Sequence, residues 1–269
     1  MSLHTVSEPL LSMETSLSSP AEMIRLENVS VCYRVPRDHF TTFKEYAIRL
    51  LQGKVKHDSF LALKNVSLSV RKGEVFGLIG HNGAGKSTLL KLVARVMRPS
   101  SGRVVVRGWV APLLEIGAGF HPDLTGRENV FLNGAILGFP QQEIDGLFDS
   151  IVEFSELQDF IDAPLRTYSS GMMARLGFAV ATGARPEVLI VDEILGVGDE
   201  AFQWKCYERI KGFCKEGTTI FMVTHNASLI EMMCHRVAWL DHGRLMGVGG
   251  PAEMIQSYRE HQHAQPAGK

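Results

Sequence analysis

The clearest chemical signal in the chain is a glycine-rich segment that ends in Lys-Ser-Thr. It fits the pattern G-x-x-x-x-G-K-S/T, and it lies between the apolar run Val75–Ile79 and the helix-forming run Thr88–Ala94. Glycines allow backbone N–H groups to point at an anion, and a helix N-terminus adds partial positive charge. The segment therefore predicts a site for the phosphates of a nucleoside triphosphate. Its residues are Gly80, His81, Asn82, Gly83, Ala84, Gly85, Lys86, Ser87 and Thr88.

A pair of acidic residues follows another apolar run, Val188–Val191. Open α/β sheets bind their ligands at the ends of such strands, although an apolar strand that merely runs into an acidic loop has the same appearance. Beside a phosphate loop, we expect Asp192 and Ser87 to bind Mg²⁺, Asp192 mostly through water. Glu193 is the expected base for the water that attacks the γ phosphate, and Lys86 is expected to reach the β and γ phosphates.

The elements that must position these residues alternate between strands and helices. This alternation predicts an α/β fold with a mainly parallel sheet covered on both faces. Thr125–Glu128 forms a capping box and predicts the start of a helix within a helical lobe at about 112–185. We divide the chain into a flexible tail at 1–22, one domain at 23–248, and a C-terminal helix and tail at 249–269. Further strands are expected at Ile24–Val35, Leu61–Val70, Gly102–Val110, Thr219–Val223 and Val237–Leu240.

An insert at about 37–57 separates the first two expected strands. Thr42–Glu45 fits a capping box, and apolar residues recur at helical spacing from Phe40 to Leu51. The insert also carries an excess of positive charge. Such a basic amphipathic helix can lie at a membrane surface or dock beside a membrane protein, and it can equally pack on its own domain.

Composition excludes several classes of protein. With 28 basic and 29 acidic residues in 269 and a net charge of -1, the composition argues against a dedicated nucleic-acid binder, although it leaves room for a local basic patch. No apolar run is long enough to span a bilayer, and the N-terminus lacks the pattern of a secretion signal. These features predict a cytoplasmic protein with reduced thiols. The four cysteines are Cys32, Cys206, Cys214 and Cys234.

The segment Tyr168–Met172 resembles the L-S-G-G-Q signature of ABC-type ATPases and matches it at Ser169 and Gly171. This resemblance implies an ABC-type nucleotide-binding domain, a P-loop NTPase with an inserted helical lobe. It also implies a head-to-tail dimer that encloses two ATP molecules, in which Ser169, Ser170 and Gly171 of one copy close on the γ phosphate held by the other. Asp199 resembles the D-loop aspartate of the family. His225 resembles its switch histidine, which contacts the γ phosphate.

Two positions depart from the family pattern or stay open. Where the family carries a Q-loop glutamine, this chain has Glu115, so the metal contact there is a carboxylate or is lost. The aromatic platform for adenine is Tyr33 or Phe60, because the insert between them obscures the usual spacing. We prefer Tyr33.

Three further segments resemble one subfamily, the ATPase subunits of exporters for O-antigen, capsule or teichoic acid. They are Leu114–Pro122 with Thr125–Asn129, Arg175–Val180, and Asp192–Asp199, and the resemblance covers about 23–248. It implies an integral membrane permease partner, a lipid-linked polysaccharide as the transported substrate, no nucleic acid, and a peripheral position on the cytoplasmic face of the membrane. The basic insert is similar to one found near the membrane in these exporters.

Some members of that subfamily carry an added C-terminal domain that binds the polysaccharide. This chain stops at Lys269, so we expect polymer selection to rest with the membrane subunit or a separate protein. Three alternatives remain: an ATPase of another exporter, a soluble ABC ATPase acting on nucleic acid or ribosomes, and a regulatory module that does not hydrolyse ATP. Glu193 and His225 argue against the last, and the absence of a coiled-coil insert, a second ATPase domain or a basic face argues against the soluble ATPase.

Overall fold

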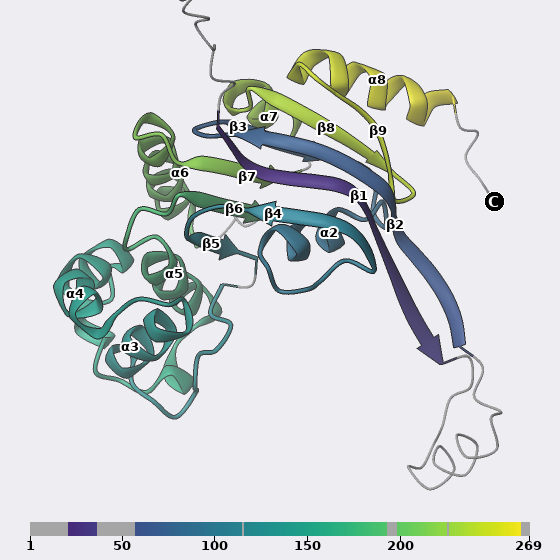
Figure 1. The fold of residues 1–269 in the computed structure, drawn as a ribbon. Helices are drawn as coiled ribbons and strands as arrows, with labels where there is room; N and C mark the ends of the chain where they lie inside the picture. Colours follow the sequence, from purple (N-terminus) through teal and green to yellow (C-terminus); the bar gives the residue numbers. More distant parts are fainter. Residues whose placement is uncertain (1–20, 37–56, 115, 193–197, 225, 265–269) are drawn as a thin grey trace, which may run out of the picture.

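A computed structural model describes residues 21–36, 57–114, 116–192, 198–224 and 226–264. Its strands form two sheets, one antiparallel and one mainly parallel (Figure 1). The antiparallel sheet has the order β2-β1-β4 and consists of β1 (Glu22–Pro36), β2 (His57–Arg71) and β4 (Ser101–Val106). The second sheet has the order β5-β6-β7-β3-β8-β9 and consists of β5 (Val110–Leu113), β6 (Val188–Asp192), β7 (Thr219–Val223), β3 (Val75–Ile79), β8 (Arg236–Asp241) and β9 (Arg244–Gly249).

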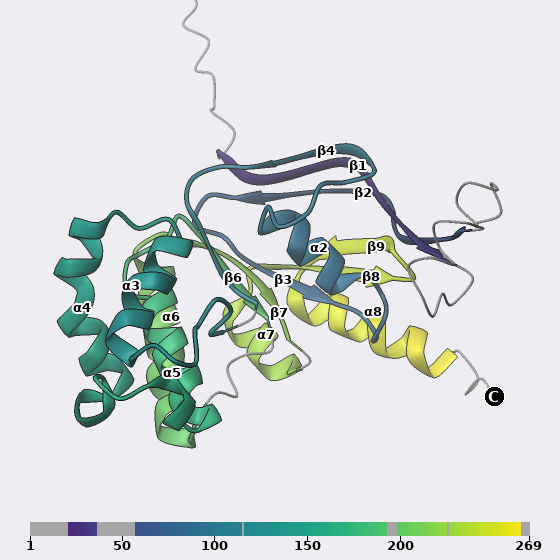
Figure 2. The ribbon, with the colours of Figure 1, turned by 90° about the horizontal axis from the view of Figure 1, so that it is seen from below.

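The second sheet is parallel except at its edge, where β9 runs antiparallel to β8. All five residues of β3 and of β7 are buried, as expected for central strands covered on both faces. On one face, helix α2 (Lys86–Val93) lies between the two sheets, as Figure 2 shows. On the other face, the sheet is covered by α6 (Glu200–Lys215), α7 (Ala227–Met233) and α8 (Pro251–Ala264).

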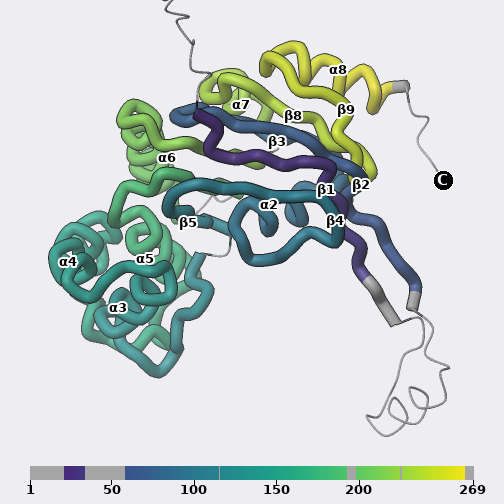
Figure 3. The backbone as a smooth tube through the Cα atoms, viewed as in Figure 1, coloured from purple at the N-terminus to yellow at the C-terminus, as the bar shows by residue number. Residues whose placement is uncertain are grey.

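A lobe of helices lies to one side of the sheets, away from α8 (Figure 3). It contains α3 (Gly126–Ile136), α4 (Gln141–Ser155), two short 3₁₀ turns at Gln158–Phe160 and Leu165–Thr167, and α5 (Ser170–Ala181). The lobe has its own apolar cluster, which includes Val130, Ile144 and Leu176. Thr125 and Glu128 cap α3 reciprocally, as the sequence pattern predicts. The hydrogen bond from the N–H of Thr125 is the main reason, and the bond from its hydroxyl a second one, that the pKa of the Glu128 carboxyl lies below its usual range.

One expected strand is wrong. The residues from Gly102 to Val110 do not form a single strand, because β4 and β5 belong to different sheets. Between them the chain turns at Gly108, whose φ of 75° favours glycine, and a Cβ there would lie 2.7 Å from the side chain of Glu187. Sequence hydrophobicity alone does not distinguish a continuous strand from one that changes sheets at a glycine.

The predicted α/β class with a mainly parallel sheet is confirmed. The predicted amphipathic insert and most of the N-terminal tail lie outside the described residues. Within the described ranges, no helix combines the length and apolar character needed to cross a membrane.

Candidate functional site

The glycine-rich segment connects the buried strand β3 to the first turn of α2. Gly80 and Gly85 have φ values of 156° and 106°. A Cβ at Gly80 would collide with the carbonyl oxygen of Leu240, and one at Gly85 would lie 2.7 Å from the carbonyl oxygen of Ala62. The loop therefore needs glycine at both positions for backbone angle and for space.

Lys86, the first residue of α2, is buried and points back across this loop. Its Nζ donates to the carbonyl oxygens of Gly80 at 2.7 Å and His81 at 3.1 Å. Burying an ammonium group is costly unless hydrogen bonds compensate it, and these carbonyl oxygens provide that compensation. The positive charge is thus held in place beside the N-terminus of α2, where it can meet an anion without reorganising the loop.

The loop opens into a cavity of about 440 Å³ that also contains Asp192, the last residue of β6. Ser87 and Thr88 line the same cavity. A hydroxyl group and a carboxylate are oxygen donors of the kind that Mg²⁺ prefers, so the donor set fits this ion. The structure therefore brings together the predicted phosphate loop and the predicted metal carboxylate, which are far apart in the sequence.

Both candidate platforms for adenine lie on the wall of this cavity. Tyr33 of β1 pairs directly with Phe60 of β2 across the antiparallel sheet. The Tyr33 hydroxyl lies 3.4 Å from the hydroxyl of Thr88, within hydrogen-bond distance. The side chains differ in exposure, 37% for Tyr33 and 60% for Phe60. Both rings are available to a bound base, so the preference for Tyr33 stays a prediction.

The predicted signature segment lies at the start of α5. Ser169 caps this helix, and its hydroxyl accepts a hydrogen bond from the N–H of Met172 at 3.1 Å. Ser170 and Gly171 form the first turn, where N–H groups that lack an intrahelical acceptor favour an anion. These residues line a second cavity of about 650 Å³, together with Gly198 and Asp199.

Asp199 joins this second cavity from the N-terminus of α6. Its carboxylate caps the helix through the N–H of Phe202 at 2.9 Å and pairs with Arg175 of α5 at 2.5 Å. The Phe202 N–H is the main reason, and Arg175 a further one, that the pKa of Asp199 lies below its usual value. Arg175 also binds Glu156 at 2.7 Å. In the sequence this bridging arginine is notable only as the first residue of a family-like segment, although its spacing from Gly171 places it on the next turn of the same helix.

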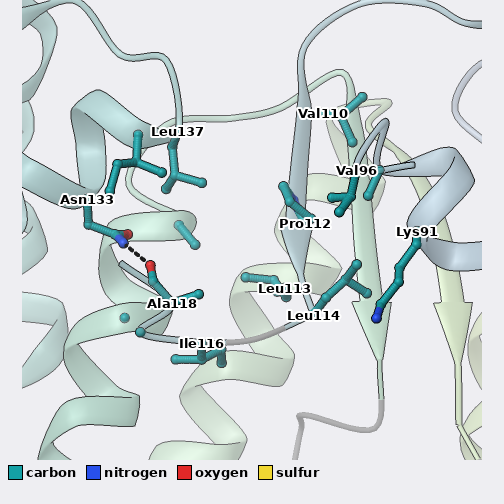
Figure 4. Close-up of a pocket in the computed structure, with 15 residues that line it drawn as sticks. Lys91, Val96, Val110, Pro112, Leu113, Leu114, Ile116, Ala118, Asn133 and Leu137 are labelled. Carbon is teal, nitrogen blue, oxygen red and sulfur yellow. Dashed lines mark hydrogen bonds between the residues drawn. The ribbon is translucent and has the colours of Figure 1, made fainter. Parts of the chain in front are cut away.

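A third cavity, of about 400 Å³, lies between the helical lobe and the sheets (Figure 4). Its lining is mostly apolar and includes Val96, Leu114 and Ile116, with Lys91 entering from α2. On the lobe side, Asn133 of α3 donates to the carbonyl oxygen of Ala118 at 2.8 Å, the bond drawn in Figure 4. Sequence patterns did not predict this cavity, because its walls come from elements that are distant in the chain.

The chain that follows the cavity-lining residues Gly117 and Ala118 is held by a buried amide group. Asn129 of α3 is fully buried, and its side chain accepts from the N–H of His121 and donates to the carbonyl oxygens of His121, Leu124 and Thr125. In the sequence Asn129 is notable only within a family-like segment, and its role as an anchor needs the tertiary structure. Three predicted site residues, Glu115, Glu193 and His225, lie outside the described residues.

A strand, a phosphate loop and a helix, with an acidic residue at the end of another strand of the same sheet, define a P-loop nucleoside triphosphatase. A family model for the ABC transporter family matches residues 63–196. The chain is also 50% identical over 214 residues to the O-antigen export system ATP-binding protein RfbB of Klebsiella pneumoniae, an alignment that covers 80% of this chain and 85% of the relative. The chain belongs to the ABC transporter family, and it is an ATP-binding subunit and an ATPase of that family.

Two other relatives and one solved structure show the same kinship. The RfbB protein of Myxococcus xanthus is 48% identical, with 84% of this chain and 53% of the relative covered. The teichoic acids export ATP-binding protein TagH of Levilactobacillus brevis is 40% identical, with 88% and 64% covered. An ATP-binding cassette solved as a dimer with ADP and phosphate superposes with a TM-score of 0.67 at 21% identity, covering 85% of this chain and 99% of that one. The latter likeness supports the fold.

Proposed function

We propose that this chain is the ATPase subunit that drives export of a lipid-linked polysaccharide through a membrane permease. The observation that carries the proposal is the complete phosphate loop, with buried Lys86 directed across it and Asp192 in the same cavity. The polysaccharide is supported by relatives of 40% to 50% identity that are named for O-antigen or teichoic acid export. We place the chain at the cytoplasmic face of the membrane, where a permease can receive it.

In this proposal the phosphates of ATP occupy the cavity at the loop, and Ser87 and Asp192 hold Mg²⁺. Bound Mg²⁺ neutralises charge that develops on the phosphate oxygens. Lys86 contributes a fixed positive charge to the same end. Glu193, the residue after Asp192, orients and deprotonates the attacking water, and His225 contacts the γ phosphate. Phosphoryl transfer depends mainly on positioning and electrostatics, which a preorganised loop provides.

The signature residues act on a second copy of the chain. Within one chain, Ser169 and Asp199 line one cavity while Lys86 and Asp192 line another. The N–H groups at the start of α5 suit a phosphate, but they do not share the cavity of the loop. A head-to-tail dimer places the signature of each copy over the loop of the other and encloses two ATP molecules. The dimeric cassette to which the chain is similar in fold supports this arrangement.

The cavity between the lobe and the sheets is the proposed contact for the permease. It is lined by apolar side chains around Gly117 and Ala118, and Figure 4 shows it bounded by α3 on one side and by α2 on the other. The segment that lines this cavity at Ile116, Gly117 and Ala118 begins directly after Glu115, a proposed metal contact. A shift at the nucleotide is therefore passed to the wall of this cavity within a few residues. The 37–57 insert is a second proposed contact with the membrane or its permease.

The decisive experiment measures where long-chain glycan accumulates in the native host. Cells that carry Lys86→Ala in place of the normal chain are expected to retain polymer inside and to lose it from the surface. Lys215→Ala is the matched control, since Lys215 is exposed at the end of α6, and it should leave export normal. Normal surface glycan with a stable, inactive Lys86→Ala protein would refute polysaccharide export and favour another transported substrate.

Nucleotide binding itself is tested with the same variant in vitro. A charge-assisted hydrogen bond contributes about 1.5–3 kcal/mol, so loss of the Lys86 contacts to phosphate should weaken ATP binding roughly 10- to 150-fold. Titration calorimetry of normal protein, Lys86→Ala and Lys215→Ala measures this difference. Equal affinities for all three proteins would contradict the assignment of the phosphate site.

A further inference from the structure

Two histidines and an aspartate meet beside the phosphate loop, outside the cavity described for nucleotide. His81 belongs to the loop, whereas Asp241 ends β8 and His242 lies in the turn to β9. One ligand atom of each side chain lies within 4.8 Å of the others. The two imidazole rings are 4.6 Å apart between centroids. The two segments are also joined by a hydrogen bond from the N–H of Gly243 to the carbonyl oxygen of Ala84, at 2.9 Å.

The hydrogen bonds of His81 determine which of its nitrogens offers a lone pair. Its Nδ1 lies 2.6 Å from the carbonyl oxygen of Asn82, which can only accept, so Nδ1 carries the proton. In a neutral ring, Nε2 then presents a lone pair. This atom is shielded from solvent and has no hydrogen-bond partner among the described residues, although Oδ1 of Asp241 lies only 3.1 Å away. Two electron-pair donors at this distance are stabilised by a cation between them, either a proton on Nε2, which makes an ion pair with Asp241, or a metal ion.

We propose that His81, Asp241 and His242 bind a divalent transition metal ion with the preferences of Zn²⁺. Tetrahedral Zn²⁺ with bonds of about 2.0–2.1 Å places its ligand atoms about 3.3 Å apart, close to the separation of His81 Nε2 and Asp241 Oδ1. Two imidazoles and one carboxylate are a zinc donor set, and water completes the fourth position. The bond from His81 Nδ1 to a backbone carbonyl is the outer contact that metal-bound histidines usually make.

This site is separate from the proposed magnesium position. None of its three residues lines the cavity that contains Ser87 and Asp192. A bound ion would instead join the outer side of the phosphate loop to the β8–β9 turn. Because the His81 carbonyl oxygen also accepts from Lys86, the ion would restrain the backbone that positions this lysine. The proposal does not depend on the transported substrate.

The test uses the untagged full-length chain, first stripped of metal with a chelator. Zn²⁺ is titrated in competition with a chromophoric chelator, and one ion per chain with micromolar or tighter affinity is expected. His242→Asn is the main variant. His242 and Gly243 have positive φ values of 43° and 78°, and hairpin turns with positive φ at both central residues favour Asn-Gly, so asparagine should preserve the turn. Removal of this ligand should lower affinity by more than about tenfold. Asp241→Asn should act in the same direction, and exposed His263→Asn on α8 should have no effect.

A second readout separates this site from thiol binding and from a failure to fold. The normal chain is loaded with Co²⁺, and its spectrum should show ligand-field bands without the sulfur-to-metal bands that a cysteine ligand such as Cys32 or Cys214 would produce. Excess Mg²⁺ should not displace the ion, because imidazole ligands disfavour it. Zinc affinity weaker than about 1 mM, sulfur-to-cobalt bands, or equal affinity for normal chain and folded His242→Asn would each overturn the proposal.

Discussion

Gly177 offers the sharpest test of how α5 is connected to the 116–117 segment, which lines the cavity between the helical lobe and the sheets. It lies in α5, and a Cβ there would be 2.5 Å from Cγ2 of Ile116 and 2.8 Å from the backbone nitrogen of Gly117. Carbon atoms pack at about 3.5–4.0 Å, so Gly177→Ala must displace this segment by about 1 Å. Because one of the contacted atoms is backbone, rotation of a side chain does not relieve the overlap.

The magnitude follows from comparison with a glycine that has space around it. Gly212 lies in α6, and a Cβ added there would have no atom within 4 Å. Replacing a helical glycine by alanine stabilises the helix by about 1 kcal/mol in either place. Overpacking costs about 1–3 kcal/mol at Gly177 only. The propensity gain cancels in the comparison, so Gly177→Ala should be less stable than Gly212→Ala by about 1–3 kcal/mol.

Thermal unfolding of the two variants in the absence of nucleotide measures this difference. For a domain of this size each kcal/mol of stability shifts Tm by about 2–4 °C. A stability difference of about 2 kcal/mol, the middle of the expected range, therefore separates the Tm values of the two variants by about 4–8 °C. Gly212→Ala should unfold above the normal chain. The exposed helical Gly146, which also has nothing near its Cβ position, provides a second control. Equal stabilisation of Gly177→Ala and Gly212→Ala would refute the tight contact between α5 and the 116–117 segment.

Three other predictions concern the catalytic role of Glu193, the stacking of adenine and the reactivity of two thiols. Glu193→Gln should retain ATP binding and lose nearly all turnover, because only the base for water is removed; a single-turnover assay with an unchanged rate would contradict this role. Stacking of adenine on an aromatic ring contributes about 1–3 kcal/mol, so Tyr33→Ala should weaken ATP binding roughly 5- to 150-fold and Phe60→Ala should weaken it less. Binding of inorganic triphosphate should be unchanged in both variants. A larger loss in Phe60→Ala would assign the platform to Phe60. Burial raises the pKa of the Cys206 and Cys234 thiols to about 12, so neither should react with a thiol reagent at pH 8 until the protein unfolds, as mass spectrometry of labelled peptides can show.

The parts of the fold that were predictable depend on short-range signals. Buried parallel strands such as β3 and β7 are continuous apolar runs, and the helix at Gly126 starts at a capping box. The change of sheets at Gly108 and the pairing of β8 with β9 depend instead on which distant strand each segment meets. No local pattern contains that information.

The candidate site shows the same division between local and long-range information. Ser169 is recognisable as a helix cap from its own neighbours, whereas the pair of Arg175 with Asp199 requires α5 and α6 to lie together. Tyr33 and Phe60 were alternatives because the intervening insert removes any fixed spacing. They pair across β1 and β2, a register that includes several irregularities and that the sequence does not reveal.

The phosphate loop itself illustrates why a motif predicts a function better than it explains a conformation. The G-x-x-x-x-G-K-S pattern predicts the loop, yet the atoms that exclude a side chain at Gly80 and Gly85 belong to Leu240 on β8 and Ala62 on β2. These strands come from different sheets, and α2 lies between them. The loop is therefore constrained from two sides by elements far away in the sequence. A substitution that shifts β8 against β2 should disturb phosphate binding even when every residue of the motif is intact.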